Sequence, residues 1–376
     1  MKPEGNFSSL TIAIIGSGQL ARMMALEGIS MGYHFTFLHE EGEDKSAVLD
    51  LGHIVTVDVK QHSAEQIYTL LGKPDVVTVE KEHVDAGMLE GLNQFCPVYP
   101  SIKAIRISQN RKSEKEFIQS QGIEVAPWHP VNDIDSLTEA GTRLGWPVIL
   151  KTCSEGYDGK GQWFLNSLEE GSKVLEEVSS DIEFIAEQPI SFSKEVSIVC
   201  ARDQHGNIVH YDISENIHSN GILHYSIVPA RNIKTETQNK AKKIAEAMLT
   251  GLEYIGVLSI EFFVVGDDLM VNEFAPRVHN SGHWTQQGAR TSQFLNHVRA
   301  ISGQEVASTE RFGPAAMINL LGQAPLKKHM IDSALHVHWY NKTIKANRKV
   351  GHINMSLSDI ESLMVKLEQT LKDYQQ

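Results

Sequence analysis

Short apolar runs alternate with helical patterns over the first hundred residues of the chain. Residues 10–15, 35–38 and 76–79 are rich in the β-branched and aromatic side chains of buried strands, and residues 64–71 repeat apolar positions at helical spacing. Strands that alternate with helices in this way predict a doubly wound parallel sheet. A charged helix is expected next, at residues 112–121.

The pattern changes after Pro147, where strand-like segments follow one another with few helices between them. They lie at residues 148–150, 162–165, 183–186, 196–201 and 208–213. Tight turns such as residues 203–207 favour antiparallel pairing, so an α+β region is predicted to follow the α/β region. A helix at residues 235–249 precedes a further β pair, and residues 315–376 contain short strands and a final helix.

The composition is that of an ordinary globular protein, with 41% hydrophobic and 22% charged residues. The 376 residues exceed what one compact core usually accommodates, so two or three domains are expected. A net charge of −13 argues against nucleic-acid and anionic-membrane binding. The three scattered cysteines form neither a disulfide framework nor a zinc motif, no apolar run approaches the roughly 20 residues of a membrane span, and no secretory pattern is present. We therefore expect a cytoplasmic protein.

The first candidate for chemistry is the turn formed by Gly16, Ser17 and Gly18 between a strand and a helix. Glycines there let backbone N–H groups approach an anion at the positive end of the helix. The segment also satisfies the GxGxxA pattern of dinucleotide-binding folds, with Glu40 near the expected place of a ribose-binding acid. A tight turn that only packs a strand against a helix explains the same residues. The motif alone does not decide among these three interpretations.

The second candidate is a glycine-rich loop. Lys151, at the expected end of a strand, is followed by Gly156, Gly159 and Gly161, with Lys160 among them. Exposed N–H groups and a cation on such a loop can enclose phosphates. The loop joins two strands and lacks GKS or GKT, so it is not a P-loop. A flexible surface hairpin is the plain alternative, and the second lysine favours phosphate binding.

The third candidate is a pair of glutamates in a predicted hairpin. With residues 266–268 as a three-residue turn, Val265 pairs with Leu269 and Glu261 pairs with Glu273. Two carboxylates opposed on one face repel each other, whereas a divalent cation such as Mg²⁺ between them reverses the sign of the interaction. The alternative is an exposed face whose charges splay into water, which a matched pair among apolar residues disfavours.

The segment after this hairpin is polar and has no clear periodicity, as in a loop that carries function. Arg277 suits recognition of a phosphate or carboxylate. His279 and His283 have the i, i+4 spacing of a helical zinc pair, but a neighbouring proline and glycine disfavour a helix, so we reject zinc here. Further along, Arg348 and Lys349 form a basic pair that by itself is most often a solvated pair on a strand edge.

Nearly the whole chain is covered by ordered motifs, namely GSGQLARMM, VTVEKE, QNRKSEKEF, EGYDGKGQ, FSKEVS, NEFAPRVHNSGHWTQ and RKVGHIN. The sequence thereby resembles the 5-(carboxyamino)imidazole ribonucleotide synthetase family, which are ATP-grasp ligases of purine biosynthesis. The segment NEFAPRVHNSGHWT is the most specific part of the resemblance. The resemblance implies an N-terminal doubly wound parallel-sheet domain at residues 1–106, an ATP-grasp domain at residues 107–300 and a small C-terminal domain at residues 301–376.

The resemblance also implies an activity. Enzymes of this family use ATP, Mg²⁺ and bicarbonate to carboxylate the exocyclic amine of 5-aminoimidazole ribonucleotide through carboxyphosphate, and they are usually homodimers. Other interpretations stay open. One is an ATP-grasp ligase with a different carboxylate or amine substrate, such as a formate-using purine enzyme or a biotin carboxylase relative. Another is an NAD-dependent oxidoreductase, and a third is a non-catalytic nucleotide-binding regulator.

Roles for individual residues follow from the same resemblance. The ATP phosphates are expected to contact Arg111, Lys151, Gly156, Tyr157, Asp158, Gly159, Lys160, Gly161 and Gln162. The adenine and ribose are expected to contact Glu187, Gln188, Ile190, Glu195 and His218. Mg²⁺ is expected at Glu261 and Glu273, with Asn272 near the nucleotide even though strict strand alternation points it away from Glu273. Bicarbonate and carboxyphosphate are expected near Glu80, Tyr157 and Lys349, and the ribonucleotide near Gln19, Leu20, Arg277, Asn280, Arg348 and Lys349.

Overall fold

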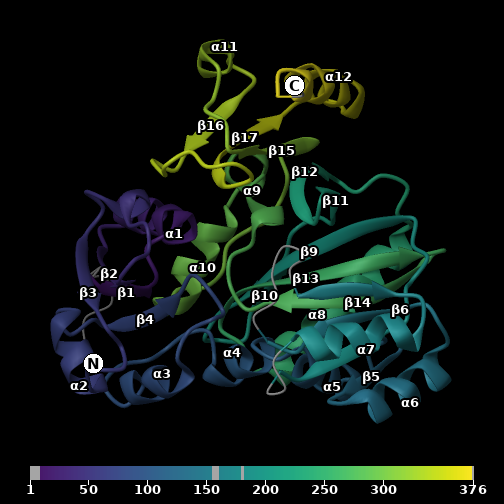
Figure 1. The fold of residues 1–376 in the computed structure, drawn as a ribbon. Helices are drawn as coiled ribbons and strands as arrows, with labels where there is room; N and C mark the ends of the chain where they lie inside the picture. The colour runs from purple at the N-terminus through teal and green to yellow at the C-terminus, as the bar shows by residue number, and fades with distance from the viewer. Residues whose placement is uncertain (1–8, 155–160, 179–181, 375–376) are drawn as a thin grey trace.

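In the computed structural model, residues 9–154, 161–178 and 182–374 are described, and they form three β-sheets with helices on their faces (Figure 1). One sheet is parallel and lies in the N-terminal region. The other two are antiparallel and contain the strands of the middle and C-terminal regions.

The N-terminal sheet is parallel, with strand order β3-β2-β1-β4. Its strands are β1 Thr11–Ile15, β2 His34–Glu40, β3 His53–Val57 and β4 Val76–Val79, and the helices around it are α1 Gln19–Ser30, η1 Ser46–Val48, α2 Ala64–Leu70, α3 Ala86–Leu92 and α4 Ile102–Ser108. Ile12 and Ile14 pack on the side of α1, whereas Ala13 and Ile15 pack on the side of α2 and α3. The predicted doubly wound parallel sheet is confirmed. β3 was not predicted, because it buries only two of its residues, Val55 and Val57.

A small antiparallel sheet follows, with strand order β5-β8-β6-β7. Its strands are β5 Trp128–Val131, β6 Val148–Thr152, β7 Gln162–Leu165 and β8 Phe184–Glu187, and the helices of this region are α5 Arg111–Ser120, α6 Ile134–Leu144 and α7 Leu168–Glu177. Asn110 caps α5 by accepting a hydrogen bond from the Ser113 N–H group. The cap fixes Arg111 at the first position of the helix, where its guanidinium donates to the Thr152 carbonyl at 2.8 Å.

The large sheet is antiparallel, with strand order β14-β13-β9-β11-β12-β15-β17-β16 and β10 paired to β9. Its strands are β9 Lys194–Arg202, β10 Ile208–His210, β11 Ser214–Ser219, β12 Ile222–Val228, β13 Gly256–Val265, β14 Asp268–Ala275, β15 Ala315–Leu321, β16 His336–Trp339 and β17 Lys349–Ser356. Its helices are α8 Thr235–Gly251, η2 Asn280–Gly282, α9 Thr285–Gly288, α10 Gln293–Ile301, α11 Lys327–Ile331 and α12 Ile360–Lys372. The strand predicted at residues 208–213 ends at His210, and β11 resumes the pairing with β9 at Ser214. The last three strands follow residue 301 yet continue the same sheet, and the domain boundaries stay a prediction.

Helix α10 connects the N-terminal sheet to the large sheet. Phe294 and Val298 belong to the same buried cluster as Met23 and Met24 of α1. His297 accepts a hydrogen bond from the Val257 N–H group at 3.1 Å on one side, and its other ring nitrogen lies 2.8 Å from the hydroxyl of Thr78. These buried contacts join β4 to β13 through the His297 ring.

Candidate active site

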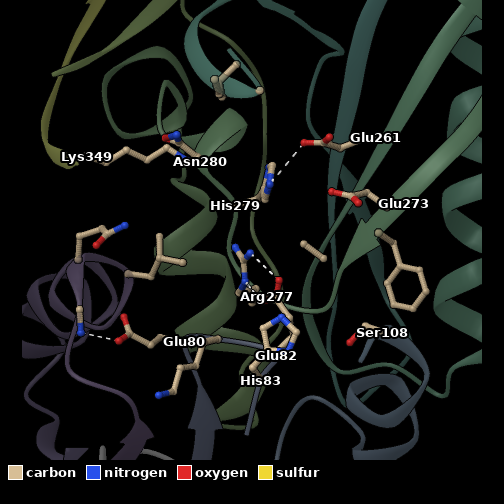
Figure 2. Close-up of a pocket in the computed structure, with 18 of the residues that line it drawn as sticks. Glu80, Glu82, His83, Ser108, Glu261, Glu273, Arg277, His279, Asn280 and Lys349 are labelled. Carbon is tan, nitrogen blue, oxygen red and sulfur yellow. Dashed lines mark hydrogen bonds and ion pairs between the residues drawn. The ribbon is translucent and has the colours of Figure 1, made fainter. Parts of the chain in front are cut away.

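A cleft of about 800 Å³ lies between the N-terminal sheet, the large sheet and the C-terminal strands, and Figure 2 shows charged residues facing one another across it. Of the predicted residues, the cleft wall contains Gln19, Leu20, Glu80, Arg111, Gln162, Glu195, His218, Glu261, Asn272, Glu273, Arg277, Asn280, Arg348 and Lys349. Other predicted residues are described but are not part of this wall, namely Lys151, Gly161, Glu187, Gln188 and Ile190. The predicted loop residues Gly156, Tyr157, Asp158, Gly159 and Lys160 lie outside the described residues.

Glu261 and Glu273 are directly opposed in the hairpin of β13 and β14, as predicted (Figure 2). The predicted register near the turn was wrong, however. Val265 pairs with Asp268 rather than with Leu269, because the turn has two residues and not three. An irregularity on the β14 side, between the pairs Phe262–Val271 and Glu261–Glu273, then shifts the register by one residue, and this shift restores the glutamate pair.

The extra residue at that irregularity is Asn272, which has no cross-strand partner in β13. Strict alternation predicted that Asn272 would point away from Glu273, but both residues line the cleft. A β-bulge interrupts alternation in this way, because two successive residues share one position on the strand opposite. Asn272 is therefore available to the same ligand as the two glutamates.

The glutamate pair is electrostatically strained without a cation. Burial and then the charge of Glu273 raise the pKa of Glu261 to about 7. A third carboxyl group, that of Glu114 on α5, accepts a hydrogen bond from the Phe274 N–H group at 2.7 Å, and burial followed by the charge of Glu273 raises its pKa to about 8. Mg²⁺ is commonly held by one or two carboxylates together with phosphate oxygens. Two opposed carboxylates on a cleft wall fit that requirement, although no cluster of three or more His, Cys, Asp and Glu side chains arranged for a metal occurs in the described part of the chain.

The glycine turn before α1 holds a carboxylate of the protein itself. The side chain of Glu80, at the end of β4, accepts hydrogen bonds from the N–H groups of Gly18 and Ala21, the latter at 2.9 Å. A Cβ atom at Gly16 would lie 2.4 Å from the Glu80 side chain, which explains the glycine. The anion expected at this helix terminus is thus Glu80, and Glu40 pairs with Lys81 at 3.0 Å. Both contacts disfavour the dinucleotide interpretation, since they occupy the groups that a pyrophosphate and a ribose would need.

Lys151 and Glu187 are buried and lie outside the cleft wall, and their predicted contacts with ATP stay a prediction. Glu187 is buried between Lys115 at 2.8 Å and Lys151 at 2.6 Å. Burial alone would raise the pKa of Glu187, but the two lysines lower it to about 2. Glu187 is therefore an ionised centre that holds the strand ends of β6 and β8 against α5.

Glu195 and His218 form a second polar group on the wall, on neighbouring strands β9 and β11. Their side chains are 3.1 Å apart. Burial lowers the pKa of His218, but the adjacent Glu195 carboxylate outweighs that effect and raises it. The two side chains also lie near Glu261, whose charge acts on His218 in the same direction.

The wall opposite the glutamates is basic. Arg348 lies 2.9 Å from Asp44, Lys342 contacts Gln19, and Lys349 begins β17. Burial lowers the pKa of Lys342. Arg348 and Lys349 thus line the cleft rather than lying on a solvated strand edge, and Figure 2 shows Lys349 on the side opposite Glu261 and Glu273.

Three family descriptions match successive parts of the chain. They are a ribonucleotide synthetase preATP-grasp domain at residues 9–109, an ATP-grasp domain at residues 116–294 and a phosphoribosylaminoimidazole carboxylase C-terminal domain at residues 315–366. The chain is 37% identical over 366 residues to the N5-carboxyaminoimidazole ribonucleotide synthase of Vibrio cholerae, covering 95% of this chain and 94% of that protein. It is 39% identical over 349 residues to the enzyme of the same name from Brucella melitensis, covering 91% and 95%. The chain belongs to the N5-carboxyaminoimidazole ribonucleotide synthase family.

Solved structures of this family have the same fold. The N5-carboxyaminoimidazole ribonucleotide synthetase of Thermus thermophilus matches with a TM-score of 0.88 at 36% identity, covering 96% of this chain and 98% of that one. An Aspergillus clavatus N5-carboxyaminoimidazole synthase, solved with ADP and 5-aminoimidazole ribonucleotide, matches with a TM-score of 0.86 at 27% identity, covering 97% and 98%. The predicted ATP-grasp fold is confirmed.

Sequence patterns missed several charged residues of the cleft in this member of the N5-carboxyaminoimidazole ribonucleotide synthase family, among them Glu82, Glu114 and Lys342. Glu82 lies two residues beyond Glu80, and it binds Arg277 through two contacts. Glu114 lies on α5, whose many charged residues are typical of a solvent-exposed helix. Lys342 lies in a short polar segment. The available signal was that Glu82 and Glu114 fall inside motifs that carried the resemblance. Among the described residues, none of the helices has the length and apolar character needed to cross a bilayer.

Proposed function

We propose that the protein carboxylates the exocyclic amine of 5-aminoimidazole ribonucleotide, using ATP, Mg²⁺ and bicarbonate. The products are 5-(carboxyamino)imidazole ribonucleotide, ADP and phosphate. One observation carries the proposal beyond family membership. The opposed pair of Glu261 and Glu273 faces a wall that carries Lys342, Arg348 and Lys349, so a single cleft offers both a cation site and an anion site.

The carboxylate wall is assigned to the nucleotide. Glu261, Glu273 and Asn272 would hold Mg²⁺ and the phosphate oxygens bound to it, and Arg111 would contact the phosphates from the start of α5. When bound, the ion supplies neutralisation of the charge that develops as the terminal phosphoryl group is transferred. Glu195 and His218 lie beside this wall, where a ribose hydroxyl group can be hydrogen-bonded.

The opposite wall is assigned to the second substrate. Arg348 and Lys349 would hold the ribonucleotide phosphate, with Gln19 and Asn280 beside the sugar and base. Such an anchor orients the amine toward the carbon that it attacks, and orientation is a large part of the rate enhancement in a two-substrate reaction. Glu80 is rigidly held by N–H groups of α1, so it is suited to accept a proton from bicarbonate or from the attacking amine.

The chemistry balances without a redox cofactor. A bicarbonate oxygen attacks the terminal phosphorus of ATP, ADP leaves, and carboxyphosphate forms. The amine then forms the C–N bond as phosphate departs, and the proton lost from nitrogen goes to a base or to the departing phosphate. Carboxyphosphate hydrolyses readily, so the cleft must exclude water during the reaction. Tyr157 and Lys349 belong to the same proposal as residues near this intermediate.

Phosphate release from ATP tests the proposal when it is measured with and without 5-aminoimidazole ribonucleotide and bicarbonate. Carboxylated product is followed in parallel with ¹³C-labelled bicarbonate. We expect one phosphate per carboxylated product, with both substrates required. Full phosphate release with formate in place of bicarbonate, or with no ribonucleotide, would assign the chain to another ATP-grasp ligase activity. The homodimer and the cytoplasmic location implied by the resemblance are parts of the proposal, and sedimentation of the purified protein tests the first.

A further inference from the structure

A line of buried polar side chains crosses the large sheet and ends at the cleft. It runs from Ser226 on β12 to Asn216 on β11 at 2.8 Å, then to Ser197 on β9 at 2.9 Å. The Ser197 hydroxyl lies 2.8 Å from that of Ser281, which in turn lies 2.9 Å from the Nδ1 atom of His279. The first four residues are each at most 6% exposed. Burying polar atoms costs free energy unless they are hydrogen-bonded. These side chains therefore form a buried hydrogen-bond network rather than a set of surface contacts.

One backbone group fixes the direction of every hydrogen bond in the line. The Ser281 N–H group donates to the Nδ1 atom of His279 at 3.3 Å, and a backbone N–H can only donate. Nδ1 therefore carries a lone pair, and the Ser281 hydroxyl beside it must donate to it as well. Because that hydroxyl has one hydrogen, it has to accept from the Ser197 hydroxyl. Ser197 in turn accepts from the Asn216 amide NH₂ group, which leaves the Asn216 oxygen to accept from Ser226.

The protonation of the other ring nitrogen, Nε2, follows from this. With Nδ1 as an acceptor, the neutral ring carries its hydrogen on Nε2. Nε2 lies 3.5 Å from Oε1 of Glu261, and Figure 2 shows the His279 ring directed at that carboxylate. The two side chains are 15% and 17% exposed, so water screens this contact only in part. The residue that faces the cation site is thus an uncharged N–H donor.

We propose that His279 is a positioning residue for Glu261, and that the line from Ser226 to Ser281 sets its tautomer. This inference rests on the proposed metal role of Glu261. A protonated imidazole would neutralise Glu261 and repel a divalent cation. A neutral Nε2–H group instead orients one carboxylate oxygen and leaves the negative charge for the cation. Outer groups that orient metal ligands act in this way, and losing one typically costs about 10- to 100-fold in metal affinity.

The tautomer is tested directly by ¹⁵N NMR of the histidine ring nitrogens in the purified full-length protein. A His279→Gln variant, which lacks the ring, assigns the signal. We expect a neutral ring with hydrogen on Nε2 at pH 7. Hydrogen on Nδ1, or a charged ring, would overturn the inference. This measurement needs neither ATP nor turnover, so it stands or falls apart from the proposed reaction.

The positioning role is tested by calorimetric titration of Mn²⁺ in the presence of ADP. His279→Leu removes the donor and should weaken Mn²⁺ binding by about 10- to 100-fold, whereas His279→Gln keeps an N–H group near the place of Nε2 and should recover most of the affinity. Ser281→Ala and Ser197→Ala should each weaken binding less than His279→Leu does. Ser259→Ala is the matched control, because Ser259 is a buried serine whose hydroxyl has no partner among the described residues. Equal Mn²⁺ affinity in His279→Leu and wild type would refute the role.

Two combined outcomes separate this inference from the proposed function. If the Nε2 tautomer and the loss of Mn²⁺ affinity are both observed but no carboxylated product forms, the positioning role holds and the assigned reaction fails. If carboxylated product forms while the ring carries its hydrogen on Nδ1, the assigned reaction holds and the positioning role fails.

Discussion

Glu82 and Arg277, which are 195 residues apart in the sequence, form a two-contact ion pair on the wall of the cleft. The Arg277 Nε atom lies 2.5 Å from Oε2 of Glu82, and its Nη2 atom lies 3.0 Å from Oε1. The pair ties the segment after β4 to the loop after β14, so it aligns the N-terminal sheet with the strand that carries Glu273. Both partners are largely buried, and parallel contacts of this kind add geometric specificity to the attraction.

Replacing Glu82 by Gln should destabilise the fold, because Arg277 is left as a buried charge without its counterion. We expect a loss of about 2 to 4 kcal/mol in the free energy of unfolding, measured by urea denaturation. Glu90→Gln is the control, since Glu90 pairs with Arg106 at the surface and both side chains are more than half exposed. That variant should lose under about 1 kcal/mol. Similar losses in the two variants would show that Arg277 is not left as a costly unpaired charge when Glu82 is replaced.

The same ion pair has a defined pH window. Burial would raise the pKa of Glu82, but Arg277 outweighs it and lowers that pKa to about 2. A carboxyl group with a depressed folded-state pKa contributes stability above its unfolded pKa, about 4.3, and loses it as pH falls toward the folded value. The gap in unfolding free energy between wild type and Glu82→Gln should therefore be constant at pH 6 to 8 and shrink between about pH 4.5 and 2. A gap that widens on acidification would contradict the ionised pair.

The partner of Arg277 shows why only part of the site could be predicted. The sequence showed a guanidinium in a polar loop, but its counterion lies just after a distant strand. Local sequence patterns contain no information about contacts between segments so far apart in the chain. Strands with strong apolar runs, such as β4 and β7, were predicted with their observed bounds. Strands β11 and β12 were missed, because buried polar residues such as Asn216 and Ser226 break the apolar pattern.

The glutamate pair was predicted from two assumptions that were each off by one residue. The turn is one residue shorter than assumed, and Asn272 adds one residue to β14. The two differences cancel, so Glu261 still opposes Glu273. Periodicity cannot detect a bulge, because the bulge depends on how the backbone hydrogen bonds are shared between the strands. The family motif located Asn272 in the site where strand alternation did not.

Glu261→Gln and Glu273→Gln should each lower turnover by about a hundredfold or more, as the loss of a key electrostatic contact to the reacting group does. The stability of the hairpin should not fall in these variants when no metal is present. In chelator each variant should be at least as stable as wild type, because one of two repelling charges is gone. Steady-state phosphate release and thermal denaturation in chelator measure the two effects. Asp267→Asn, in the exposed turn of the same hairpin, should change neither. Normal turnover in either glutamine variant would remove the metal assignment.

ATP with Mg²⁺ should raise the melting temperature, whereas NAD and NADP should leave it unchanged. A ligand present at 100 times its dissociation constant stabilises the folded state by about 2.7 kcal/mol. The carboxylate of Glu80 already accepts the N–H groups at the start of α1, so a dinucleotide pyrophosphate would meet a negative charge there. Thermal denaturation with each nucleotide is the measurement. Stabilisation by NAD at micromolar concentration without any response to ATP would restore the oxidoreductase interpretation.

Arg348→Ala should raise the Michaelis constant for 5-aminoimidazole ribonucleotide by about 10- to 100-fold, since a hydrogen bond to a charged group contributes roughly 1.5 to 3 kcal/mol. The Michaelis constant for ATP should change by less than about twofold, because the guanidinium lies on the wall opposite Glu261 and Glu273. Asp44, 2.9 Å away, keeps Arg348 in place before substrate binds. Lys345→Ala removes an exposed cation from the same segment and serves as the control. Steady-state kinetics with each substrate varied in turn gives both constants. If Arg348→Ala weakened ATP and left the ribonucleotide constant unchanged, the two walls would have been assigned the wrong way round.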